Sequence, residues 1–271
     1  MNAVTTRYII LWVFSAAFIA AFATYSSISN INLGQPEFIT GYVLFGLMLG
    51  LATFNARKKL SMVPFGRSAY WLAVHVVGGI AALGLFFIHT GNVWPTGAYE
   101  QALAIVFYLV TISGIFGYII QKIYPKRLVQ TELEIIYERI PAELSELREK
   151  SESITIACTE NTGSDTLARH YMESLRWYFQ RPRFFLSHTL GGAAAEHWIN
   201  QSYQTVSRYL SEAEREYLNN LNDLAKYKSK IDFHFACQSM MKYWLLAHVP
   251  LAAAVLALIF WHVIVVNVYA L

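Results

Sequence analysis

Long uncharged stretches separate short charged ones along most of this chain. Five stretches contain no Asp, Glu, Lys or Arg: 8–36, 38–56, 68–99, 101–121 and 243–271, with lengths of 29, 19, 32, 21 and 29 residues. Because roughly 20 predominantly apolar residues in a helix cross a bilayer, each stretch can hold one membrane span. The pattern predicts an all-α, polytopic membrane protein with five transmembrane helices. The stretches are too continuous for an outer-membrane β-barrel.

Most of the charged residues lie in one segment between the fourth and fifth stretches. We therefore expect three parts: 1–121 with spans one to four, 122–242 as a cytoplasmic helical insertion, and 243–271 as span five. Within the insertion, the periodicity predicts helices over 127–140, 142–152, 165–180 and 193–210, with a Ser/Thr-rich loop at 153–165. The sequence from Ser211 to Glu214 has the form of a capping box. It predicts a helix that runs from there into span five.

The basic residues predict how the chain is oriented. They occur after span two (Arg57, Lys58, Lys59 and Arg67) and after span four (Lys122, Lys126 and Arg127), whereas the segments 29–37 and 91–100 contain none. Loops rich in Lys and Arg stay in the cytoplasm. We expect a multi-pass protein of the cytoplasmic (inner) membrane, with its N-terminus inside and its C-terminus outside.

The composition excludes several classes of protein. The chain is 55% hydrophobic and 14% charged, whereas soluble domains average about 25% charged residues, and such an apolar chain is not disordered. Its two cysteines, Cys158 and Cys237, do not make a disulfide scaffold. The insertion 122–242 contains 16 basic and 16 acidic residues, so nucleic-acid binding is not expected.

Four of the eight histidines lie in the uncharged stretches. His75 and His89 are 14 residues apart in span three, and so are His248 and His262 in span five. Fourteen helical residues rise about 21 Å and return to within roughly 40° of the same face. Since spans three and five run in the same direction, we expect His75 opposite His248 and His89 opposite His262.

Paired imidazoles at one depth are typical of axial ligands to haem iron. No Asp, Glu or Cys is expected beside them, and zinc prefers four ligands. Polar residues are costly in lipid and usually mark function. The alternatives are four buried core histidines or a proton path.

Other small and polar residues support less specific predictions. Five glycines could let spans two and four approach the edge of a haem. The alternative is that they simply pack against neighbouring helices. They are Gly41, Gly46, Gly50, Gly114 and Gly117. The histidines of the insertion are expected at the surface or at an interface, with a third haem as the alternative: His170, His188, His197 and His234.

The two His-x13-His helices resemble the di-haem four-helix bundle of the cytochrome b subunit of quinol–cytochrome c reductases. They are also similar to ferric reductase and NADPH oxidase membrane domains, and to the nitrate reductase gamma subunit. The resemblance covers spans two to five. It implies that the ligands of two haem b groups are His75, His89, His248 and His262. The chain differs by an extra first span, the large insertion, and the lack of both a Pro-Glu-Trp-Tyr motif and a nucleotide-binding glycine loop.

These features predict transmembrane electron transfer. We expect the cytochrome b subunit of a multi-subunit respiratory oxidoreductase, which exchanges electrons with quinone or a partner redox subunit. Because the outer segments contain no Lys or Arg to meet haem propionates, we expect a partner on the outer face. The alternatives are a self-standing reductase of ferric iron or oxygen, and a non-redox scaffold whose insertion recruits cytoplasmic partners.

Overall fold

The computed structural model describes residues 3–56 and 68–269, and every regular element in these ranges is helical. The predicted basic loop with Arg57, Lys58, Lys59 and Arg67 lies outside the described residues. The chain forms two compact units, which we call the membrane unit (Met1–Ile119 with Trp244–Leu271) and the inserted unit (Ile120–Tyr243).

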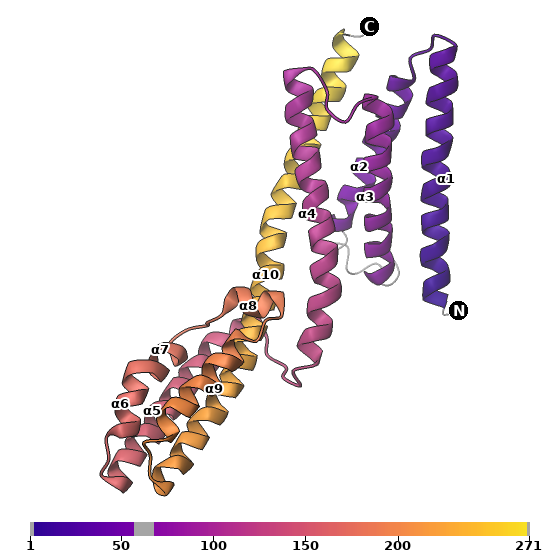
Figure 1. Ribbon diagram of the computed structural model, residues 1–271. Helices are drawn as coiled ribbons and strands as arrows, with labels where there is room; N and C mark the ends of the chain where they lie inside the picture. Colours follow the sequence, from indigo (N-terminus) through magenta and orange to yellow (C-terminus); the bar gives the residue numbers. More distant parts are fainter. Residues whose placement is uncertain (1–2, 57–67, 270–271) are drawn as a thin grey trace. The chain divides into compact units, whose positions relative to one another are not determined.

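Five helices are long and apolar enough to cross a membrane, as the sequence predicts. They are α1 (Ala3–Ile31), α2 (Pro36–Ala56), α3 (Ser68–Thr90), α4 (Ala98–Val129) and α10 (Glu212–Tyr269), labelled in Figure 1. Many large apolar side chains on them face outward; Phe14, for example, is 71% exposed. Such an apolar exterior is costly in water and suits lipid.

The core of the membrane unit draws on four of these helices. Its buried members are Leu44 and Met48 of α2, Ala82, Leu85 and Phe86 of α3, Ala104 and Phe107 of α4, and Val255 of α10. The rings of Phe86 and Phe107 stack at 4.5 Å. Helix α1 packs outside this core, against α2 and α3.

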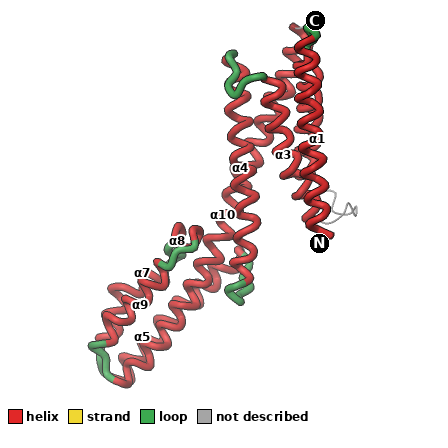
Figure 2. Tube along the Cα trace, turned by 45° about the vertical axis from the view of Figure 1, so that its right-hand side comes forward, coloured by secondary structure: helices red, strands yellow, loops and turns green. Residues whose placement is uncertain are grey.

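The inserted unit is a helical bundle around its own apolar core. Its helices are α5 (Ile140–Thr162), α6 (Thr166–His170), the π-helical turn η2 (Tyr171–Leu175), α7 (Arg176–Phe179), α8 (Phe185–Leu190), α9 (Ala194–Ser207) and the first part of α10, joined by the short loops in Figure 2. Tyr178, Phe179, Leu167 and Leu221 are completely buried in it. The predicted helices 165–180 and 193–210 correspond to α6–α7 and α9, whereas α8 was not expected.

The predicted helix 127–140 is wrong. Helix α4 ends at Val129, and the chain is not helical again until the 3-10 turn η1 (Tyr137–Arg139). Pro141 does not end a helix but lies in the first turn of α5. Proline is favoured there because the first helical N–H groups have no intrahelical partner to lose.

The predicted loop 153–165 is also wrong, because α5 continues through it to Thr162. The hydroxyls of Thr155, Thr159 and Thr162 donate to the carbonyls four residues earlier. These bonds satisfy the side chains inside the helix, where hydroxyl residues otherwise compete for the backbone. The helix stops at Gly163, whose φ of +69° favours glycine.

The predicted capping box is confirmed at the start of α10. The Ser211 N–H donates to Glu214 Oε2 at 2.8 Å, and the Glu214 N–H donates to Ser211 Oγ at 3.4 Å. From Glu212 the helix runs without interruption to Tyr269, past Pro250.

A buried ion pair ties the α7–α8 turn to α10 within the inserted unit. Lys228 Nζ donates to Asp232 Oδ2 at 2.6 Å, and both side chains are completely buried. Lys228 also donates to the Arg181 carbonyl at 2.9 Å, and the Arg183 N–H donates to Asp232 Oδ2 at 3.1 Å. The pair therefore supplies hydrogen bonds to a turn whose backbone is not helical.

We expect Asp232→Ala to destabilise the inserted unit by about 3–5 kcal/mol, because it leaves the Lys228 ammonium buried without its partner. Thermal unfolding of the full chain in detergent, followed by circular dichroism, measures the effect. The control is Asp223→Ala, which removes the exposed pair with Lys226 and should cost less than about 1 kcal/mol. Equal losses in the two variants would contradict the argument.

Candidate functional site

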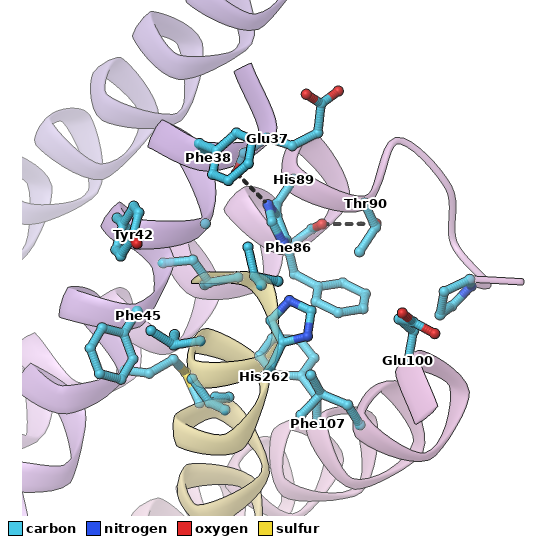
Figure 3. Close-up of a pocket in the computed structure, with 18 of the residues that line it drawn as sticks. Glu37, Phe38, Tyr42, Phe45, Phe86, His89, Thr90, Glu100, Phe107 and His262 are labelled. Carbon is cyan, nitrogen blue, oxygen red and sulfur yellow. Dashed lines mark hydrogen bonds between the residues drawn. The ribbon is translucent and has the colours of Figure 1, made fainter. Parts of the chain in front are cut away.

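His89 of α3 and His262 of α10 face each other in the membrane unit. Their ring centroids are 6.3 Å apart, and their planes are nearly perpendicular at 87°. Figure 3 shows both imidazoles projecting into one cavity, with a volume of about 340 Å³. Its walls come from α2, α3, α4 and α10 and are mostly apolar: Phe38, Leu44, Phe45, Met48, Phe86, Leu103, Phe107, Ile259, Val263 and Val266.

The backbone of α2 orients the His89 ring. His89 Nδ1 lies 3.0 Å from the Glu37 carbonyl oxygen and 3.4 Å from Thr40 Oγ1. A carbonyl oxygen can only accept, so Nδ1 carries the proton and donates it. Nε2 is then unprotonated, which is the form that a metal ion binds.

Close approach of α2 to His89 depends on Gly41. A Cβ atom at this position would lie 2.8 Å from His89 Cε1, closer than packed carbon atoms sit. The Tyr99 ring stacks on the His262 ring, with their centroids 6.1 Å apart. The Tyr99 hydroxyl donates to the Leu258 carbonyl. Both imidazoles are thus held in place by neighbouring helices.

The second pair consists of His75 on α3 and His248 on α10, and the two rings have separate neighbours. Ser113 Oγ lies 3.2 Å from His248 Nδ1, and the Trp244 ring stacks on His248 at 5.3 Å. The Phe54 ring lies against His75 at 4.8 Å. His75 Nδ1 is buried beside Leu51 without a hydrogen bond of ordinary geometry to any described residue.

His89 and His262, whose ring centroids are 6.3 Å apart, could hold a metal ion between two imidazole nitrogens. Among the described residues, no group of three or more His, Cys, Asp or Glu side chains gathers at one point. Two imidazoles in an apolar cavity therefore suit a metal whose other ligands come from a macrocycle.

The glycines noted in the sequence differ in their surroundings. Gly41 lies against His89, and a Cβ at Gly114 would lie 3.6 Å from His248 Cε1. Gly117 leaves room for the Trp244 indole, whereas Gly46 and Gly50 have no neighbouring atom within 4 Å. Two of the five glycines thus adjoin the candidate ligands.

The histidines of the inserted unit are partly mispredicted. His197 is exposed and His170 is half-buried, but His188 and His234 are buried. The expectation of surface or interface positions is wrong for these two. His234 Nε2 hydrogen-bonds to Thr131 Oγ1 at 2.7 Å, which gives that ring a structural role.

Comparison with known proteins leaves the site to be argued from its own geometry. No protein family, curated protein or solved structure matches this chain. The structure brings His89 and His262 together, whereas His75 lies against Phe54 of α2 and His248 against Ser113 of α4. The structure also shows hydrogen-bond partners that the sequence cannot indicate. The main one is the backbone carbonyl of Glu37, a group that every residue type carries.

We expect Gly41→Ala to displace His89 and to destabilise the membrane unit by about 1–3 kcal/mol through overpacking. The matched control is Gly46→Ala in the same helix, where a methyl group meets open space and alanine favours the helix. The midpoint of denaturation by dodecyl sulfate compares the two variants. If Gly41→Ala were as stable as Gly46→Ala, the close approach of α2 to His89 would be disproved.

Proposed function

We propose that this protein carries electrons across a membrane through two haem b groups, of which His89 and His262 would hold one and His75 and His248 the other. The observation that carries this proposal is the separation of 6.3 Å between the His89 and His262 rings, in a cavity with apolar walls. When bound, haem iron supplies a one-electron carrier that changes between the ferrous and ferric states.

The residues of the chain would prepare the ligands and exclude water. The Glu37 carbonyl holds the Nδ1 proton of His89, and Ser113 lies beside Nδ1 of His248. Hydrogen bonds of this kind fix the tautomer and the ring orientation of a metal-binding histidine. The stacked rings of Phe86 and Phe107 line the cavity between His89 and His262 and present an apolar surface to it.

We further propose that the protein lies in the cytoplasmic membrane with the inserted unit in the cytoplasm. The support is the distribution of Lys and Arg, which are absent from the segments 29–37 and 91–100 and present in every other loop between the uncharged stretches. The outer pair of histidines would then lie near the outer surface and the inner pair near the cytoplasm.

The outer cavity supports a role as one subunit of a respiratory oxidoreductase. Two carboxylates, Glu37 and Glu100, line this cavity, whereas none of its lining residues is Lys or Arg. Haem propionates near lipid need a counter-charge or water. A partner subunit that presents cationic side chains would satisfy both the propionates and these carboxylates, and would exchange electrons there. Quinone is the other exchange partner that an apolar cavity of this kind accommodates.

The purified protein should contain about two haem b groups per chain, measured by pyridine haemochrome analysis. Replacing His89 with Ala should remove one haem and leave the other, because the inner pair keeps both ligands. The control is His197→Ala, an exposed histidine of the inserted unit, which should leave both haems.

A preparation without haem would reject electron transfer and favour the non-redox scaffold. If two haems are present, mass spectrometry of the complex purified from native membranes distinguishes a respiratory subunit from a self-standing reductase. Flavoprotein or iron–sulfur subunits in the complex support the respiratory subunit. Their absence, with direct reduction of ferric iron or oxygen, supports the self-standing reductase.

The orientation is tested by labelling intact cells with a membrane-impermeant maleimide. Asn92→Cys, between α3 and α4, should react from outside, whereas Glu149→Cys on α5 should react only after the cells are opened. The native Cys158 and Cys237 are buried and give a low background, measured in the unmodified protein. The reverse pattern would overturn the orientation without affecting the haem sites.

A further inference from the structure

The inserted unit exposes a set of apolar side chains that its own core does not use. Its four most exposed aliphatic residues are Leu190, Val129, Leu186 and Ile136, at 81%, 80%, 70% and 61%. We call these four residues the apolar rim. A single surface leucine is ordinary, whereas apolar side chains gathered in one place mark a contact surface.

The two leucines of the apolar rim lie on α8, and two ring contacts place this helix along α10. The ring centroids of Phe185 and Phe235 are 6.5 Å apart, and those of His188 and Phe233 are 6.0 Å apart. Figure 1 shows α8 beside α10 at this point. Helix α8 is thus level with residues 233–235 of α10.

The other two members of the apolar rim lie at the same level of α10. Thr131, two residues after Val129, hydrogen-bonds through its hydroxyl to His234 at 2.7 Å. The carbonyl of the residue before Ile136 accepts a hydrogen bond from the Gln238 amide at 2.8 Å. Segments that are far apart in the sequence therefore bring their exposed apolar side chains to one end of the inserted unit.

This end is the one from which α10 continues into its uncharged stretch. The stretch 243–271 begins five to ten residues after the segment 233–238, which is about 8–15 Å of helix. Helix α7 lies further from the stretch, since the Tyr178 hydroxyl donates to the Ala225 carbonyl. The apolar rim is therefore at the end of the inserted unit that is nearest the membrane-spanning part of α10.

Helix α4 gives an independent measure of the same distance. Arg127 Nη1 donates to the Thr189 carbonyl of α8 at 3.5 Å. The uncharged stretch 101–121 ends six residues before Arg127, about 9 Å of helix. Both helices are long and apolar enough to cross a membrane. An apolar helix face at an interface is buried about 5–10 Å into the headgroup and acyl boundary, a depth that side chains on α8 can reach.

The sequence around α8 suits contact with lipid. The segment 184–195 is the longest run in 122–242 without Asp, Glu, Lys or Arg. Its exposed residues are Leu186, Leu190, Gly191, Gly192, Ala193 and Ala194. No charged side chain of this segment would lose its water on contact with lipid. The adjacent cations Lys126 and Arg127 match the charge of anionic headgroups.

We propose that the apolar rim docks onto the lipid interface, with Leu186 and Leu190 of α8 inserted at the boundary between headgroups and acyl chains. Lipid is the occupant because α4 and α10, which hold the rim on two sides, both enter uncharged stretches within a few turns of it. A bilayer is therefore present wherever these two helices are inserted. The proposal does not depend on haem or on the orientation of the chain.

Fluorescence quenching in phosphatidylcholine nanodiscs that each hold one full chain tests the docking. Leu190→Cys carries an environment-sensitive fluorophore, and the emission is measured with a doxyl-labelled lipid and with aqueous iodide. The matched control is Ile156→Cys, at a 58% exposed position of α5. Near it, Asn161 donates to the Tyr217 hydroxyl, which lies 26 residues, or about 39 Å of helix, before the stretch 243–271. The unmodified protein gives the background from the buried native cysteines.

The doxyl lipid should quench the label at 190 and leave the label at 156 unchanged, and iodide should show the opposite order. Equal quenching at the two positions by the doxyl lipid would overturn the proposal. Protection of position 190 from both quenchers would also overturn it, because protein and not lipid would then cover the rim.

A second measurement shows whether the leucines themselves hold this end at the lipid. The label is moved to Ile136→Cys, and Leu186→Asp is combined with Leu190→Asp in the same chain. Quenching at 136 by the doxyl lipid should fall, because two carboxylates resist transfer out of water. Circular dichroism checks folding, which exposed substitutions should preserve. Unchanged quenching in the folded double variant would contradict the insertion of α8.

Discussion

The hydrocarbon interior of a bilayer offers no hydrogen-bond partner, and the membrane unit is arranged around that constraint. Every polar group placed there needs a partner from the protein. His89 obtains one from the Glu37 carbonyl, Thr40 from the Pro36 carbonyl, and the Trp244 indole from the Ser113 carbonyl. Helices α2 and α4 therefore support the ligand helices chemically as well as sterically. The bond to the Glu37 carbonyl also places the His89 proton on Nδ1 and leaves Nε2 unprotonated.

In the inserted unit, buried polar groups obtain partners through an ion pair. Lys228 and Asp232 are completely buried, and together they bond to the backbone of the α7–α8 turn. Two buried polar atoms nearby, Asp232 Oδ1 and His188 Nε2, have no hydrogen-bond partner among the described residues.

Sequence reasoning succeeds where a physical constraint acts over many residues. The five membrane helices follow from long uncharged runs, and the meeting of His89 with His262 follows from equal spacing on parallel spans. Prediction from the sequence fails where a local interaction determines the structure. Helix α5 continues beyond residue 153 because Thr155 and Cys158 are buried in the inserted unit, although the composition resembles a loop.

Helix α10 carries His248 and His262 on one continuous helix, although Pro250 between them has no backbone N–H to donate. Each residue turns a helix by about 100°, so one inserted or deleted residue between them would rotate one imidazole away by more than a quarter of a circle. Length variation there should be eliminated by selection in descendants of this gene. A connection between helices, by contrast, tolerates changes of length at much lower cost. The positions of insertions among related genes would thus show which segments must keep a fixed length and which only connect two helices.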